Sequence, residues 1–321
     1  MITLLNTRHG REISALFALV LLLVCVAITA PSFFSPGNIN DTLLATAPVA
    51  IAAIGMLLVI LCGHIDISVA SQFAIVSVAS GVLARDGVPM PLVAIICVAL
   101  GAALGAINGG LVAFLHVPSI VATLATMIAL REALRMATQG EWIQGLPASF
   151  QWFGMSQAAG QVAIFGSTAL LYIAFAWGLR SIAAGRAVYA TGSDAESTRL
   201  AGIDPQRVVF WIFAGNGALI GLAALLNSIR FSAIQSNAGV GLEMKVIAAV
   251  VVGGASITGG RGSIAGTLIG VVLLGIIGTA LTFLGISAYW EKAIQGAIVL
   301  AAVLADPARV GRGTHARAAA A

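Results

Sequence analysis

The chain has 321 residues, of which 60% are hydrophobic and only 9% are charged. Soluble domains carry about a quarter charged residues, so this composition excludes an ordinary soluble globular protein and predicts an integral membrane protein. The formal net charge is +4, and in such a chain the basic residues report membrane orientation rather than nucleic-acid binding.

Apolar windows in chain order predict about ten membrane-spanning helices, so the expected fold class is an all-α polytopic membrane protein. The eighth window is short and interrupted by glycine, which favours a broken or re-entrant segment. A transmembrane domain is thus expected over 13–306, with tails at 1–12 and 307–321. The expected spans are about 13–30, 43–62, 67–84, 91–115, 118–137, 162–179, 208–228, 242–258, 263–284 and 288–305.

The basic residues predict the orientation of these spans. If the N-terminus lies inside, ten lysine and arginine residues gather at the inner face, against six at the outer face. The positive-inside rule then places both termini and the segment 180–207 in the cytoplasm. The first apolar run has no clean small-residue cleavage site, so it is expected to remain as a span rather than act as a cleaved signal.

The segment 180–207, between the sixth and seventh spans, is the one charged and turn-rich insert in the chain. Ser193 and Glu196 have the spacing of a capping box, which predicts a short helix starting there. Gly202 marks its expected end, and Asp204 followed by Pro205 predicts the start of the next helix. A short helix without a core of its own must lie on the membrane or dock on something else, and we expect docking.

Asp66 lies between two apolar segments with no lysine or arginine close in sequence. An acid near the bilayer centre costs about 3 kcal/mol, so such a residue usually has a partner or a role. Two interpretations stay open. Either Asp66 and Ser68 cap the third span at a wetted inner surface, or Asp66 takes part in conformational coupling.

Polar residues inside or at the ends of other spans are candidates for the translocation path. Asn108, Asn216 and Gln295 are uncharged amides within apolar segments, and they either cross-link helices or line the path. Glu243, at the start of the eighth span, either complements the helix dipole or faces the path. Glu291 with Lys292 is expected to anchor the tenth span at the interface.

The sequence argues against catalysis and metal binding. The two lysines, Lys245 and Lys292, do not follow a glycine-rich loop, so the chain lacks a P-loop and cannot hydrolyse ATP by itself. Its three cysteines lie in apolar runs without metal-ligand spacing. We therefore expect no catalytic residue, no metal site and no cofactor bound by this chain.

A set of motifs in fixed order resembles the permease subunits of bacterial ATP-binding-cassette (ABC) importers for ribose, rhamnose, xylose, arabinose and autoinducer-2. The resemblance covers about 11–306, and His64 and the pair Ser71-Gln72 depart from the family pattern. The motifs are GHIDIS at 63–68, NG at 108–109, IVATL at 120–124, the run Gly185-Arg186-Ala187-Val188-Tyr189-Ala190-Thr191-Gly192, AGI at 201–203, GLEMKVIAA at 241–249 and GGASITGGRGS at 253–263.

The resemblance implies a fold similar to type II ABC importer permeases, in which the insert 180–207 is a cytoplasmic coupling helix that docks on a separate ATPase. The residues it assigns to ATPase coupling are Ser193, Asp194, Glu196, Arg199, Ala201 and Gly202. The candidates for translocation or conformational change are Asp66, Ser68, Asn108, Asn216, Glu243 and Gln295.

The same resemblance implies the partners and the location. The partners would be a cytoplasmic ABC ATPase that holds ATP and Mg²⁺, a second permease copy or paralogue, a periplasmic sugar-binding protein and membrane lipid. Nucleic acid is not expected. The protein would lie in the bacterial inner membrane and import a neutral sugar or sugar-like solute.

Two rival functions make different demands on the sequence. A secondary transporter driven by an ion gradient, moving a small neutral solute, would need paired intramembrane carboxylates, and Asp66 is the single candidate. A scaffold or an intramembrane enzyme would need a large soluble region or a catalytic constellation, and the sequence contains neither.

Overall fold

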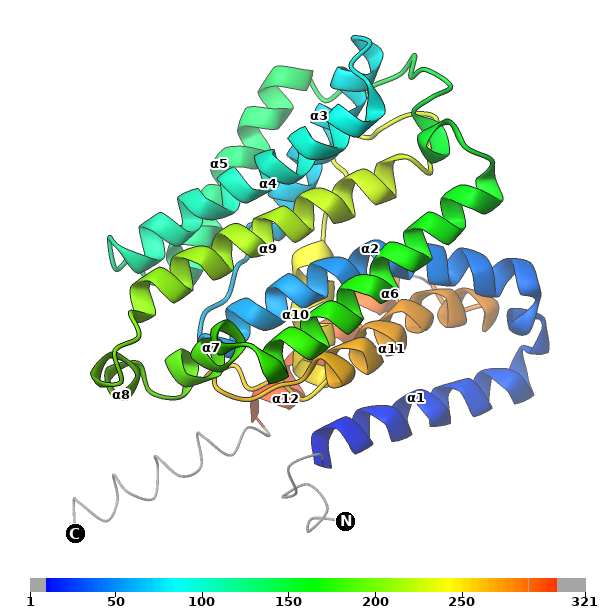
Figure 1. Cartoon of the computed structure of the whole chain (residues 1–321). Coiled ribbons are helices and arrows are strands. Elements are labelled where there is room, and N and C mark those ends of the chain that lie inside the picture. Colours follow the sequence, from blue (N-terminus) through cyan, green and yellow to red (C-terminus); the bar gives the residue numbers. More distant parts are fainter. Residues whose placement is uncertain (1–9, 288, 305–321) are drawn as a thin grey trace.

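The computed structural model describes residues 10–287 and 289–304, which form helices and connections apart from one isolated antiparallel bridge between Ile143 and Ile234 (Figure 1). Most of the expected N-terminal tail and all of the tail 307–321 lie outside these residues. In chain order the α-helices are α1 Gly10–Thr29, α2 Pro36–Leu61, α3 Val69–Arg85, α4 Met90–Ala113, α5 Ser119–Thr138, α6 Gln157–Ser181, α7 Ala183–Ser193, α8 Ala195–Leu200, α9 Pro205–Ser228, α10 Leu242–Val252, α11 Ile264–Phe283 and α12 Tyr289–Leu304, with 3-10 turns η2 Pro31–Phe34 and η3 Gln151–Gly154.

A helix forms in each of the ten windows that were expected to span the membrane, but the helices differ in length. Among the described residues, six helices are long and apolar enough to cross a bilayer: α1, α2, α4, α6, α9 and α11. The shorter α3 is also apolar. The protein is therefore an all-α polytopic membrane protein, while the count of about ten spans stays a prediction.

The eighth expected span, 242–258, is shorter than predicted because α10 ends at Val252. Gly253 lies so close to the backbone of α11 at Gly266 that no side chain would fit. Gly254 then turns the chain with a φ of 97°, and the amide of Ser256 bonds to the Arg261 carbonyl at 2.9 Å. This break agrees with the interruption that the glycines predicted.

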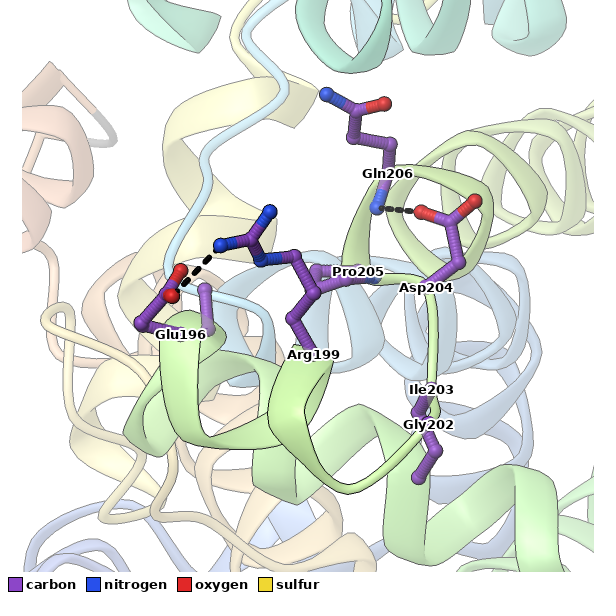
Figure 2. A pocket seen from close by; sticks show the side chains of 8 residues that line it. Glu196, Arg199, Gly202, Ile203, Asp204, Pro205 and Gln206 are labelled. Carbon is purple, nitrogen blue, oxygen red and sulfur yellow. Dashed lines mark hydrogen bonds and ion pairs between the residues drawn. The ribbon is translucent and has the colours of Figure 1, made fainter.

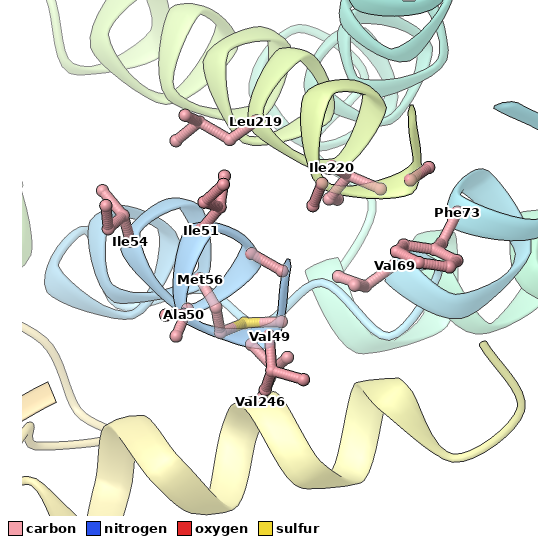
Figure 3. Packing of buried hydrophobic residues seen from close by; sticks show 14 of the residues in the cluster. Val49, Ala50, Ile51, Ile54, Met56, Val69, Phe73, Leu219, Ile220 and Val246 are labelled. Atoms are coloured by element: carbon pink, nitrogen blue, oxygen red, sulfur yellow. The ribbon is translucent and has the colours of Figure 1, made fainter. Parts of the chain in front are cut away.

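The core surrounds α2, which is apolar on all sides and has 83% of its most apolar window buried. Figure 3 shows Ile51 of α2 near Leu219 and Ile220 of α9, and Val246 of α10 on another side of α2. Because α2 has neighbours all round, the loop that follows it is also held inside the domain. That loop carries Asp66.

Glycines bring α4 and α9 into direct backbone contact. Gly101 and Gly105 of α4 face Gly217 and Gly221 of α9, and a Cβ atom at any of these positions would collide with the opposite main chain. Small residues allow this close approach in lipid, where helix association depends on van der Waals packing. The close α4–α9 contact therefore sets the positions of Asn108 and Asn216 relative to each other.

Candidate functional site

The insert consists of two helices, α7 and α8, rather than the single short helix that was expected. The predicted capping box is wrong: Ser193 is the last residue of α7, and its hydroxyl donates to the Tyr189 carbonyl at 2.8 Å. Asp194 caps α8 instead, accepting from the amides of Glu196 at 3.0 Å and Ser197 at 3.1 Å. The cap moves because Asp194 takes the extended backbone (φ −161°, ψ 104°) that an N-cap needs.

The start of α8 is organised around the Asp194 carboxylate, which also accepts from the Ser197 hydroxyl at 2.6 Å. The hydrogen bonds from the Ser197 hydroxyl and amide lower the pKa of Asp194. Glu196 forms an ion pair with Arg199 at 2.7 Å, and both side chains are largely exposed. The polar groups of α8 are therefore arranged locally and left open to the aqueous side.

The end of α8 and the start of α9 enclose an open hollow of about 600 Å³ (Figure 2). Ala201 is the C-cap of α8, and Gly202 follows in the left-handed conformation with a φ of 84°, as its sequence position predicted. Asp204 then caps α9, accepting from the Gln206 amide at 3.0 Å, and Pro205 occupies the first turn. The predicted restart of the helix at Asp204-Pro205 is confirmed.

The insert is seated on the membrane core by glycine contacts. Gly192 of α7 packs directly on the Leu61 carbonyl at the end of α2, with no room for a side chain. That carbonyl accepts from the Gly260 amide at 2.9 Å, in the loop before α11. The Tyr189 hydroxyl donates to the Gly262 carbonyl of the same loop at 2.9 Å. The helix α7 is thus in direct contact with the end of α2 and with the α10–α11 loop.

A second group of polar residues surrounds Asp66, which is fully buried between α2 and α3. Its Oδ1 accepts from the Ser68 amide at 2.9 Å and from the Ser68 hydroxyl at 2.5 Å. Its Oδ2 accepts from Asn216 at 2.9 Å and from Gln72 at 3.3 Å. The amide of Asn108 donates to the Ser68 hydroxyl at 2.7 Å. We call Asp66, Ser68, Gln72, Asn108 and Asn216 the Asp66 network.

This geometry tests one of the two interpretations of Asp66, while its role in conformational coupling stays a prediction. The wetted-surface interpretation is wrong, because Asp66 has no solvent exposure. The capping part of it is right, because Asp66 accepts the Ser68 amide just before α3. The network joins α3, α4 and α9, so Asp66, Ser68, Asn108 and Asn216 lie together as one group. Sequence reasoning did not assign Gln72 to the site, although its position in a departure from the family pattern was a usable signal.

Glu243 and Gln295 do not belong to this network. Gln295 of α12 donates to Glu291 Oε1 at 2.9 Å, and Lys245 of α10 binds the same oxygen at 3.0 Å. Glu243 has a buried carboxylate oxygen without a hydrogen-bond partner among the described residues. Glu291 was expected at the interface with Lys292, but its observed partner is Lys245. The sequence signal for this pair was two opposite charges near the starts of apolar segments.

No group of three or more histidine, cysteine, aspartate or glutamate side chains that could hold a metal ion occurs within 10–287 and 289–304. The arrangement instead provides an exposed helix pair, a buried hydrogen-bond network and a separate polar cluster among α10–α12.

Comparisons with known proteins found one matching family and several relatives of this chain. A family described as "Branched-chain amino acid transport system / permease component" matches residues 38–303. The ribose import permease protein RbsC of Escherichia coli is 36% identical over 303 residues, covering 92% of this chain and 93% of that protein. The autoinducer 2 import system permease protein LsrC of Shigella flexneri is 35% identical over 299 residues, covering 93% of this chain and 87% of that protein. No solved structure matches the chain.

Proposed function

The chain belongs to the family of branched-chain amino acid transport system permease components, and on that premise we propose that it imports a neutral, sugar-like solute. It is the non-catalytic permease component of an ABC importer, a multi-pass protein of the bacterial inner membrane. The proposed solute class follows the names of its relatives, which import ribose and autoinducer 2. Rhamnose, also suggested by the sequence motifs, stays a prediction.

The single observation that carries the proposal is the form of the insert. Its helix α8 has six residues, a complete cap and exposed charges, and it contributes little apolar surface to the domain. Marginal helices of this length gain stability from tertiary contacts rather than from propensity. A surface of this kind is suited to a groove in a partner protein. We assign that role to a cytoplasmic ABC ATPase, with Ser193, Asp194, Glu196, Arg199, Ala201 and Gly202 as the coupling residues.

The remaining parts of the importer follow from this assignment. The ATPase would hold ATP and Mg²⁺, a periplasmic binding protein would deliver the solute, and a second permease copy or paralogue would complete the path within membrane lipid. Both termini and the insert would be cytoplasmic. The fold would be that of a type II ABC importer permease with about ten spans.

The Asp66 network has a proposed role in switching between conformations. Four hydrogen bonds converge on a buried carboxylate at the junction of α3, α4 and α9. Such a network has few arrangements in which every donor is satisfied, so it favours discrete positions of these helices. An ion-gradient carrier is the rival function, and it would use the carboxylate for a proton or a cation.

The test is purification of the tagged permease from its native membrane in mild detergent, with mass spectrometry of the proteins that accompany it. We expect a P-loop ATPase, and we expect deletion of 193–202 to remove it. If the chain purifies alone and moves solute down an ion gradient in proteoliposomes, the proposed function is wrong.

A point variant gives a sharper form of this test. Glu196→Arg reverses the charge that pairs with Arg199 on the exposed face of α8, so uptake should fall at least about tenfold while the amount in the membrane is unchanged. Glu141→Arg, an exposed glutamate after α5, is the matched control and should leave uptake unchanged. Unaltered uptake in the Glu196 variant would remove α8 from the coupling surface.

A further inference from the structure

Two adjoining hollows of about 350 and 470 Å³ lie among α2, α10, α11 and α12. Both are lined by Lys245 and Glu291. The first also includes Thr46 of α2 and Thr279 of α11, and the second includes Gln295 of α12. We call these two hollows together the Glu291 pocket. It borders the C-terminal part of α11, whereas the N-terminal end of α11 follows the loop that contacts α7 (Figure 1).

Glycines of α11 make the space for this polar group. A side chain at Gly278 would collide with the Glu291 carboxylate, and one at Gly275 would collide with Thr46. The carboxylate therefore lies directly over the α11 backbone instead of pointing away from the domain. Its position in the first turn of α12 also favours a negative charge, because the helix dipole is positive there.

Both hydrogen bonds that Glu291 accepts from the described residues end on the same carboxylate oxygen. Its Oε1 accepts from both Lys245 Nζ at 3.0 Å and Gln295 Nε2 at 2.9 Å. None of the described residues donates to Oε2. Lys245 has three donor hydrogens and uses one of them on Glu291. Unused donors and an unused acceptor thus remain side by side in an open hollow.

The charged side chains of Lys245 and Glu291 would cost free energy if they faced lipid hydrocarbon. The side chains of Lys245 and Glu291 are 25% and 23% exposed, so neither is sealed inside the domain. Gly278, which the Glu291 carboxylate contacts, lies about 7.5 Å before the end of α11, at a rise of about 1.5 Å per residue, so the carboxylate lies beside the apolar body of this helix. Ionisable side chains in such surroundings face a water-filled cavity or another part of the protein.

The chemistry of the pocket is suited to one class of solute. Lys245 and Glu291 form an ion pair, which leaves Lys292 as the one charge outside that pair among the residues that line the two hollows. The pocket's free donors and acceptors, with the hydroxyl of Thr279, can bind several hydroxyl groups at once. A hollow of about 300–1,000 Å³ with a few convergent polar groups is typical of small-molecule sites.

We propose that the Glu291 pocket is a solute-binding site on the translocation path, where Glu291 Oε2 and Lys245 Nζ bind neighbouring hydroxyls of an uncharged polyol. Gln295 is a positioning residue, because it holds the other oxygen of Glu291. This inference rests on the proposed function and deepens it by placing the solute against α10, α11 and α12.

The first experiment tests whether the pocket is wet. Cysteine is introduced at Thr279 in a variant whose Cys25, Cys62 and Cys97 are replaced by alanine, and right-side-out vesicles are treated with a charged methanethiosulfonate reagent. Val162→Cys in α6 and Ile95→Cys in α4 are the controls, because these side chains are 70% and 65% exposed near the corresponding ends of their helices. We expect Thr279→Cys to react at least about tenfold faster than both controls, since the reagent reacts only in water.

The second experiment tests recognition by measuring uptake of radiolabelled D-ribose. Glu291→Gln keeps the shape of the side chain but replaces one oxygen with a donor, so KM should rise about tenfold with little change in the maximal rate. The exchange Lys245→Glu with Glu291→Lys keeps an ion pair, and it should not restore KM. Restoration by this exchange would make the pair a structural link between α10 and α12 and would overturn the inference.

The importer assignment and the role of the Glu291 pocket are contradicted by different results. If Thr279→Cys reacts no faster than the controls while a P-loop ATPase still co-purifies, the Glu291 pocket is not on the path and the importer assignment stands. If no ATPase co-purifies, the proposed function fails irrespective of the labelling result. If the wild-type protein does not take up ribose, the proposed solute is wrong, and the labelling experiment still decides whether the pocket is open to water.

Discussion

Asp66 illustrates how a buried charge is accommodated at the scale of single residues. Its carboxylate accepts four hydrogen bonds, two on each oxygen, from Ser68, Gln72 and Asn216. All four donors are N–H or O–H groups of uncharged residues. Hydrogen bonds to a charged group are stronger than those between neutral groups, which offsets part of the cost of burial.

The substitution Asp66→Asn tests this arrangement. An amide places a donor where Gln72 and Asn216 also donate, so hydrogen bonds that the carboxylate accepts there are lost, at about 1.5–3 kcal/mol each. We expect solute uptake to fall at least about tenfold at equal membrane levels, because 1.4 kcal/mol corresponds to a factor of about ten. Ser80→Ala is the control, because that buried hydroxyl bonds only to Ser77 within its own helix. Full uptake in the Asp66 variant would contradict a role for the charge.

Asp194 leads to a prediction about pH. Its pKa is lowered by the Ser197 hydrogen bonds, so its stabilising contribution is complete above the ordinary aspartate pKa and is lost only as the pH falls through the lowered value. Between about pH 5 and 8, trypsin cleavage after Arg199 in inside-out vesicles should therefore be independent of Asp194 titration. Asp194→Ala should speed cleavage throughout this range, and Asp86→Ala, in the α3–α4 loop, should not. A wild-type insert that becomes trypsin-sensitive on going from pH 8 to 5 would contradict the cap.

At the scale of elements, glycine composition determines which helices approach closely. Gly217 of α9 faces the Gly101 carbonyl of α4, whereas Gly215 of the same helix has no neighbouring atom within 4 Å of a Cβ position. These two positions differ only in what they face. The pair therefore separates the effect of packing from the effect of glycine on the helix backbone.

Gly217→Ala should destabilise the protein, because the added methyl group forces α4 and α9 apart. Overpacking of this kind costs about 1–3 kcal/mol, which corresponds to a drop of about 2–8 °C in the thermal unfolding midpoint. Gly215→Ala should leave the midpoint unchanged or raise it slightly, since alanine is the better helix former. The measurement is thermal unfolding in detergent. Equal midpoints for the two variants would contradict the close α4–α9 contact.

At the scale of the whole molecule, the contacts of α7 connect the insert to the membrane core. Gly192 touches the end of α2, and Tyr189 binds the loop between α10 and α11. The loop after α2 leads within a few residues to Asp66. The insert and the buried network are therefore linked by a short segment of chain.

Gly192→Ala should separate the insert from the core without altering α8. The added Cβ would collide with the Leu61 carbonyl, so α7 must shift. We expect the ATPase still to co-purify while uptake falls at least about tenfold. Gly178→Ala at the end of α6 is the control, because its Cβ would lie at an ordinary 3.7 Å from Ile182. Normal uptake in the Gly192 variant would show that coupling does not pass through this contact.

Much of the fold follows from local signals. The apolar windows determined ten helices to within several residues, because each helix is held by its own backbone hydrogen bonds and its apolar length. The break after α10 could also be predicted from Gly253 and Gly254. The cap of α8 was placed one residue early because Ser193 and Asp194 are both good N-cap residues. Only the backbone conformation, set by how α7 packs on α2, selects Asp194.

By itself, the sequence determined the class of the protein, the position of the insert and the list of polar residues in apolar surroundings. These depend on composition and on spacing along one helix, which are local quantities. The grouping of those residues was decided only by the tertiary structure. Asp66 meets Asn216 across 150 residues, and Lys245 meets Glu291 across 46, because α9 and α12 pack beside segments distant in the chain. Partners of buried polar groups are set by helix packing, and no spacing rule encodes them.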